Sequence, residues 1–165
     1  MTQEVRSHLE RGDADVVAGL YPDLRSFASV VAPPGMDPND LVQEALVRTL
    51  RGGSLSRLDH PKAYLRKAIY HLSVSARRRR AAEQNAVVRV VPEQVIPEDP
   101  WQVEELLRLP PKARAVLYLH VVEGLTFNEV GEQLGCSSAA ARKTASRAMH
   151  RLRRLFGGEV NDATD

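Results

Sequence analysis

The sequence has few of the residues on which several classes of protein depend. Cys136 is the single cysteine among 165 residues, and the five histidines lie singly, so neither an internal disulfide nor a zinc-binding pattern is available. Three Phe, four Tyr and one Trp are too few for an aromatic-rich β-sandwich or barrel. No apolar run reaches the roughly 18 residues of a membrane span, and the first residues lack the features of a signal peptide. These absences favour an all-α, cytoplasmic protein with no metal, no other cofactor and no membrane partner.

Charge is distributed unevenly, although its net value is only +2. Residues 1–85 carry a net charge of +3, 86–105 of −4, 106–156 of +6 and 157–165 of −3. Segregated positive charge is the usual footprint of a nucleic-acid-binding protein. Nineteen of the 23 basic residues are arginines, which suit phosphate contacts but are also enriched by a GC-rich genome. The segregation, rather than the arginine excess, therefore indicates a nucleic-acid partner.

Three amphipathic helices are predicted in the first half of the chain. Apolar residues recur at helical spacing over 13–31, where Pro22 should kink or divide the helix because its ring removes a backbone hydrogen bond. Asp37 is placed to cap a second helix, which begins with a proline and ends at a pair of glycines. A third helix opens with the proline at 61 and runs into four consecutive arginines at 77–80.

The second half begins with a predicted linker. Residues 86–105 contain three prolines and carry negative charge without a sustained hydrophobic period. Further along, a helix should open at Pro111 and continue through Val121 to Gly124. The chain therefore reads as two helical parts joined by an acidic segment.

A helix-turn-helix is predicted after this helix. Thr126 and Glu129 form a capping box before a short helix, Gly135 begins a three-residue turn, and Ser137 caps a second helix. The apolar side of that helix comprises Ala141, Ala145, Ala148, Met149 and Leu152. Its basic side comprises Arg142, Lys143, Ser146, Arg147, His150 and Arg151. Such a helix can enter the major groove of DNA, whereas a capped hairpin with a solvated basic face would show the same pattern.

The chain contains two sets of motifs. The first set is NDLVQEA at 39–45, PKAYL at 61–65 and the arginine run, and the second is LPPKAR at 109–114, EGLTFNEV at 123–130 and LGCS at 134–137. The first set resembles conserved region 2, and the second conserved region 4, of bacterial sigma factors of the extracytoplasmic-function (ECF) type. The resemblance covers roughly residues 12–82 and 104–156. It implies a region 2-like domain at 1–85, an acidic linker at 86–105, a region 4-like helix-turn-helix domain at 106–156 and an acidic tail at 157–165.

The resemblance implies a transcription initiation factor that binds core RNA polymerase through the beta-prime clamp helices and the beta flap. The factor would direct the polymerase to the minus-10 and minus-35 elements of promoter DNA and assist strand opening. An anti-sigma factor is a candidate further partner. Contacts to the clamp helices are implied for Asp40, Gln43 and Glu44.

The same resemblance assigns DNA contacts. Minus-10 recognition and melting are implied for Tyr64, Arg66, Lys67, Tyr70, His71 and Arg77. Minus-35 recognition is implied for Arg142, Lys143, Ser146 and Arg147. The family often has Trp at the position of Tyr64, and Arg-Asn is common at the positions of Tyr70 and His71.

Two other functions are left open by the residues alone. A stand-alone helix-turn-helix regulator would use the first half of the chain for dimerisation or sensing, but it would not need the DLVQE-type helix. A nucleic-acid enzyme would need paired carboxylates near a basic surface, whereas the acidic residues here are assigned to helix caps and to the linker. No catalytic constellation is predicted, and Cys136 is expected to be a small, buried turn residue.

Overall fold

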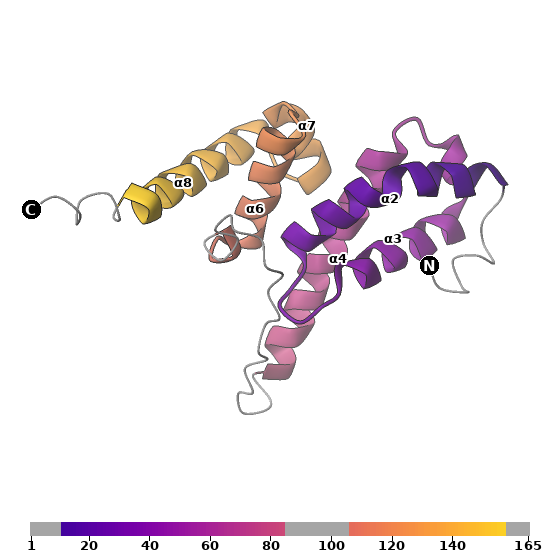
Figure 1. Cartoon of the computed structure of the whole chain (residues 1–165), viewed down its shortest axis with the longest axis horizontal. Helices are drawn as coiled ribbons and strands as arrows, with labels where there is room; N and C mark the ends of the chain where they lie inside the picture. The colour runs from indigo at the N-terminus through magenta and orange to yellow at the C-terminus, as the bar shows by residue number, and fades with distance from the viewer. Residues whose placement is uncertain (1–10, 85–105, 158–165) are drawn as a thin grey trace, which may run out of the picture. The chain divides into compact units, whose positions relative to one another are not determined.

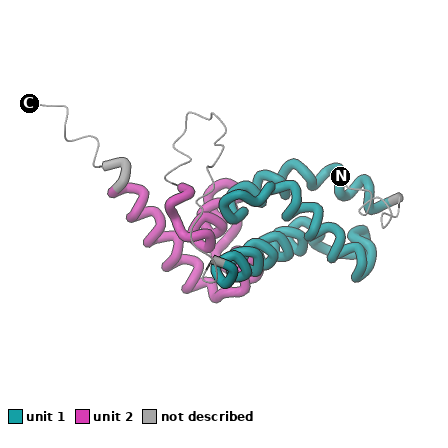
Figure 2. The backbone as a smooth tube through the Cα atoms, turned by 90° about the horizontal axis from the view of Figure 1, so that it is seen from below, with its two compact units in different colours: residues 1–95 teal, residues 96–165 magenta. Residues whose placement is uncertain are grey.

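The computed structural model describes residues 11–84 and 106–157. The chain divides into two compact units, residues 1–95 and 96–165 (Figure 2). Every regular element in the described ranges is helical, so the all-α prediction is confirmed there. None of these helices combines the length and the apolar character that crossing a membrane requires. The predicted linker, and the tail beyond residue 157, lie outside the described ranges, and the predicted domain boundaries stay predictions.

The first unit is a bundle of three helices that all contact one another. These are α2 (Arg11–Val31), α3 (Pro38–Gly52) and α4 (Pro61–Gln84), with the short helix η1 (Leu55–Arg57) between the last two (Figure 1). The core side chains are aliphatic apart from Phe27 and Tyr70. The largest fully buried ones are Leu24, Phe27, Val31, Val42, Leu46, Leu55, Leu65 and Ile69.

Local signals in the sequence account for the ends of these helices. The Asp37 side chain accepts a hydrogen bond from the Asn39 backbone N–H at 2.8 Å, as expected of an N-cap residue before Pro38. Of the two outcomes predicted for Pro22, a kink or a division of the first helix, the division is wrong, because α2 runs without a break across it. Pro22 and Ala18 are both exposed, so water can reach the Ala18 carbonyl that loses its usual donor.

The second unit contains α6 (Pro111–Leu117), the π-helical turn η2 (Tyr118–Val122), α7 (Phe127–Leu134) and α8 (Ser138–Gly157). The capping box is confirmed, since Thr126 and Glu129 bond reciprocally at the start of α7. Gly135 ends α7 with a φ of 68° in the left-handed region. The predicted helix-turn-helix is therefore present as α7, a short turn and α8.

Two side chains of this unit lie where the periodicity does not place them. Val121 is 66% exposed, whereas Leu119 is fully buried, because the wider π-helical turn changes the register after Leu117. Met149, expected in the core, is 37% exposed. The buried stripe of α8 is made instead by three alanines and Leu152, which let α8 pack closely on α6 and α7.

Candidate polymerase and nucleic-acid interfaces

The polar side of α3 lies opposite its buried stripe. Asp40 and Glu44 are exposed and Gln43 is half-buried, while Leu41 and Val42 face the core. Glu44 Oε1 accepts a hydrogen bond from Arg48 Nε at 2.6 Å within the same helix. The three residues that the resemblance assigns to polymerase contact therefore share one accessible, acidic helix face.

The start of α3 is held by α2 through Asn39. Its side-chain oxygen accepts hydrogen bonds from Tyr21 Oη and Arg25 Nε, both at 3.1 Å. The sequence motifs do not include Tyr21 and Arg25. Their hydrogen bonds to Asn39 form only when α2 packs against α3, so the sequence alone does not indicate them. They set the orientation of the turn that presents Asp40.

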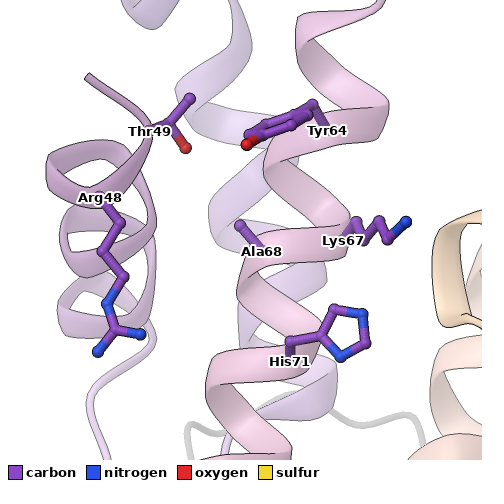
Figure 3. A pocket seen from close by; sticks show the side chains of 6 residues that line it. All are labelled: Arg48, Thr49, Tyr64, Lys67, Ala68 and His71. Atoms are coloured by element: carbon purple, nitrogen blue, oxygen red, sulfur yellow. The ribbon is translucent and has the colours of Figure 1, made fainter. Parts of the chain in front are cut away.

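A pocket of about 380 Å³ lies between α3 and α4 (Figure 3). It is lined by Arg48, Thr49, Tyr64, Lys67, Ala68 and His71. Tyr64, Lys67 and His71 recur every three or four residues, so they share one exposed face of α4, and the Tyr64 side chain is 51% exposed. An exposed ring beside cationic side chains can stack on a base and attract the phosphate backbone.

Arg66 and Tyr70 lie on the other side of α4. They are only 3% and 7% exposed, so they offer little surface to DNA, and we leave them out of the proposed DNA surface. On the same side of the bundle, Lys62 forms an ion pair with Asp23 of α2. The pKa of Asp23 is below its ordinary value, chiefly because Lys62 donates a hydrogen bond to the carboxylate and places a positive charge beside it. The positive charge of Arg66 lowers this pKa further. This part of α4 therefore joins α4 to α2.

The arginine run at 77–80 divides into two pairs. Arg77 Nη2 donates to the Val31 carbonyl at 3.1 Å, and Arg80 donates to the carbonyls of Pro34 and Gly35. Burial lowers the pKa of the Arg77 guanidinium. Arg78 and Arg79 are exposed. Arg77, predicted to contact the minus-10 element, is therefore engaged in closing the C-terminal end of α2.

Asp13 is a buried residue that the motifs do not single out. Its Oδ1 accepts hydrogen bonds from Ser54 Oγ at 2.6 Å and from the Ser56 N–H at 2.9 Å. Burial alone would raise the pKa of Asp13, but the hydrogen bonds from the segment at 54–56 outweigh it and lower the pKa. Asp13 thus holds the loop that precedes α4 against α2 through these hydrogen bonds.

The DNA-facing side predicted for α8 is solvent-accessible. Its exposed residues include Arg142, Lys143, Ser146 and Arg147. Behind them the small side chains of Ala141, Ala145 and Ala148 are buried against the rest of the unit. Ser137 Oγ accepts a hydrogen bond from the Ala140 N–H at 3.1 Å, so the start of α8 is capped as predicted.

Metal-ligating residues do not gather in the described part of the chain, where no cluster of three His, Cys, Asp or Glu side chains could hold an ion. Cys136 lies half-buried in the turn between α7 and α8. On the described helices, the candidate interfaces are the α3 face, the α4 face with its pocket, and the α8 face.

Two family models match the chain, "Sigma-70 region 2" over residues 16–83 and "Sigma-70, region 4" over residues 103–152. The RNA polymerase sigma-E factor of Streptomyces coelicolor is 31% identical over 143 residues, which cover 79% of this chain and 77% of that protein. The ECF RNA polymerase sigma factor ShbA of Streptomyces griseus is 44% identical over 55 residues, covering 33% of this chain and 29% of that protein.

A solved structure shares the fold. The sigma factor RpoE of Bartonella quintana, crystallised with the anti-sigma factor NepR, superposes with a TM-score of 0.71 at 21% sequence identity. The match covers 90% of this chain and 98% of that one. The two family matches and the extent of the Streptomyces similarity are decisive: the chain belongs to the sigma-70 family of RNA polymerase sigma factors, as an ECF-type member with regions 2 and 4.

Proposed function

We propose that the first unit of this sigma factor recognises and helps to open the minus-10 element, and that the second unit reads the minus-35 element as a duplex. As a sigma factor, the chain is a transcription initiation factor, not an enzyme, that binds core RNA polymerase and recognises promoter DNA. The observation that carries the finer proposal is that each unit exposes a basic helix face, on α4 and on α8, above a buried aliphatic core.

On α4, the pocket offers the chemistry that an unpaired base requires. Tyr64 supplies an exposed ring for stacking, while Lys67 and Arg48 supply positive charge for the neighbouring phosphates. A base that leaves the duplex loses stacking and pairing, and contacts of this kind compensate for that loss. His71 lies in the same pocket and adds a hydrogen-bonding ring.

On α8, exposed arginines at 142 and 147 support base reading in the major groove, where one guanidinium can donate two hydrogen bonds to guanine. On α3, Asp40, Gln43 and Glu44 are proposed to contact the beta-prime clamp helices. The beta-flap contact and an anti-sigma partner stay predictions from the family resemblance.

Transcription in vitro from genomic fragments, with purified core polymerase and with or without the chain, tests the proposal. We expect chain-dependent transcripts whose promoters share two upstream elements at a constant spacing. If the chain-dependent promoters share a minus-35 element but no minus-10 element, the assignment of the first unit to the minus-10 element is wrong. If the chain binds DNA but does not elute with core polymerase in gel filtration, the stand-alone regulator is favoured instead.

A further inference from the structure

Arg142 contacts an aromatic ring on the neighbouring helix. Its guanidinium carbon lies 5.6 Å from the centre of the Phe127 ring, over the face of that ring. This distance is within the about 6 Å at which a guanidinium and an aromatic face attract each other. Phe127 is the first residue of α7, and Arg142 lies on the exposed side of α8, so the contact joins the two helices of the helix-turn-helix.

The Phe127 ring is itself held in place by His120. The two rings stack with their centres 4.1 Å apart and an angle of 24° between their planes. His120 Nδ1 lies 2.8 Å from the Leu125 carbonyl, and because a carbonyl only accepts, this nitrogen carries the proton. The Leu125 N–H in turn donates to the Leu119 carbonyl at 3.0 Å. The ring beneath Arg142 is therefore braced by the turn that precedes α7.

We infer that Phe127 is a positioning residue for promoter reading: its ring holds the Arg142 guanidinium in an orientation from which it donates to a base of the minus-35 element. This inference rests on the proposed reading of that element by α8. A free arginine side chain has many rotamers, and a bidentate contact fixes one of them. When a guanidinium lies on a ring, its N–H groups at the edge still point outward and can donate to a base. The ring also restricts the side chain to fewer rotamers before DNA binds, so less conformational entropy is lost on binding.

The test uses holoenzyme assembled from core polymerase and the full chain, and it measures binding to a promoter library with every single-base change in the minus-35 element. Arg142→Ala first identifies the base pairs that Arg142 discriminates, and Arg147→Ala identifies those of Arg147. Phe127→Leu removes the ring face but keeps an apolar side chain, and Phe127→Tyr keeps the ring. Phe127→Met is a second aliphatic variant for use if Phe127→Leu does not fold.

We expect Phe127→Leu to lower discrimination about two- to fivefold at the Arg142 base pairs, and to leave the Arg147 base pairs and the affinity for non-promoter DNA unchanged. Phe127→Tyr should restore discrimination. In the Arg142→Ala background Phe127→Leu should have no further effect, because the residue through which it acts is gone. Thr126→Ala is the matched control, since it weakens the cap of α7 without touching the ring.

A loss of discrimination that is equal at all base pairs, or that persists in the Arg142→Ala background, would overturn the inference. So would unchanged discrimination in both aliphatic variants while Arg142→Ala still has its effect, and in that case the proposed role of α8 would stand. If Arg142→Ala itself leaves the preference unchanged, base reading by Arg142 is wrong and the inference fails with it.

Discussion

Gly131 and Cys136 approach each other so closely that residue 131 has no room for a side chain. The Cys136 N–H donates to the Gly131 carbonyl at 2.9 Å, and a Cβ on Gly131 would lie 2.4 Å from the Cys136 carbonyl oxygen. The obstructing atom belongs to the backbone of the turn, which cannot rotate away. The angle between α7 and α8 therefore depends on this glycine.

Gly131→Ala should destabilise the second unit by about 1–3 kcal/mol, because the turn must move to relieve the clash. Gly19→Ala in α2 is the matched control, since a Cβ there meets no atom within 4 Å. This control should raise stability by up to about 1 kcal/mol, as expected for an exposed helical glycine. Denaturant unfolding followed by circular dichroism measures both. Equal stability of Gly131→Ala and the parent chain would contradict the close approach.

Reversing charge on the α3 face should weaken polymerase binding. We expect Asp40→Lys combined with Glu44→Lys to lower the affinity for core polymerase at least about tenfold. Lysines would then stand where the proposal places two carboxylates against the polymerase, and the electrostatic complementarity of the contact would be lost. Competition for core polymerase against a labelled sigma factor gives the affinity. Asp40→Lys alone is also compared with Asp15→Lys, on the exposed side of α2, because each of these single reversals changes the net charge by the same amount. An equal effect of the two single reversals would mean that the docking face lies elsewhere.

Tyr64→Ala should impair transcription more on a duplex promoter than on one already opened at the minus-10 element. Loss of one base-stacking contact predicts a decrease of between about fivefold and a hundredfold on the duplex. Tyr64→Phe keeps the ring and should retain activity on both templates. The comparison is made with run-off transcription. Equal losses of Tyr64→Ala on the two templates would remove Tyr64 from strand opening.

The arginine run should separate into a stabilising pair and a DNA-contacting pair. Arg77→Ala with Arg80→Ala leaves the carbonyls of α2's end and the following loop without these donors, and should destabilise the first unit by about 1–2 kcal/mol. Arg78→Ala with Arg79→Ala should leave stability unchanged. The same double variant should reduce the salt dependence of holoenzyme binding to DNA. Each phosphate contact releases counterions, so losing two of these contacts makes the affinity less sensitive to salt. The reverse assignment of the two effects would refute this division.

Asp13→Asn should reveal a pH-dependent contribution to stability. The pKa of Asp13 is lowered from its ordinary value of 3.8, so the ionised carboxylate stabilises the fold above that pH. At neutral pH the amide variant should be less stable by about 1–2 kcal/mol, because hydrogen bonds to a charged acceptor are stronger. The difference should shrink as the pH falls below 3.8 through the lowered pKa. Urea unfolding at several pH values measures it, and a difference that grows at low pH would contradict the assignment.

Features that depend on residues a few positions apart could be predicted from the sequence. The Asp37 cap, the Thr126–Glu129 capping box and the left-handed Gly135 are all formed within one helical turn, so their patterns predict them directly. The same holds for the exposure of Arg142 and Arg147 on α8, which follows from helical periodicity once the alanine stripe is recognised.

The tertiary structure alone decided which polar side chains are available for function. Arg77 looks like its neighbours in the run, yet its hydrogen-bond acceptor is the carbonyl of Val31, 46 residues away. The family resemblance assigns Arg66 and Tyr70 to the minus-10 element, but the packing of α4 on α2 buries them. Helical periodicity gives the direction of a side chain around its own axis, whereas the neighbour that it meets is set by how the helices pack. That packing buries Arg66 and Tyr70, brings Arg77 to the Val31 carbonyl, and leaves Tyr64, Lys67 and His71 exposed.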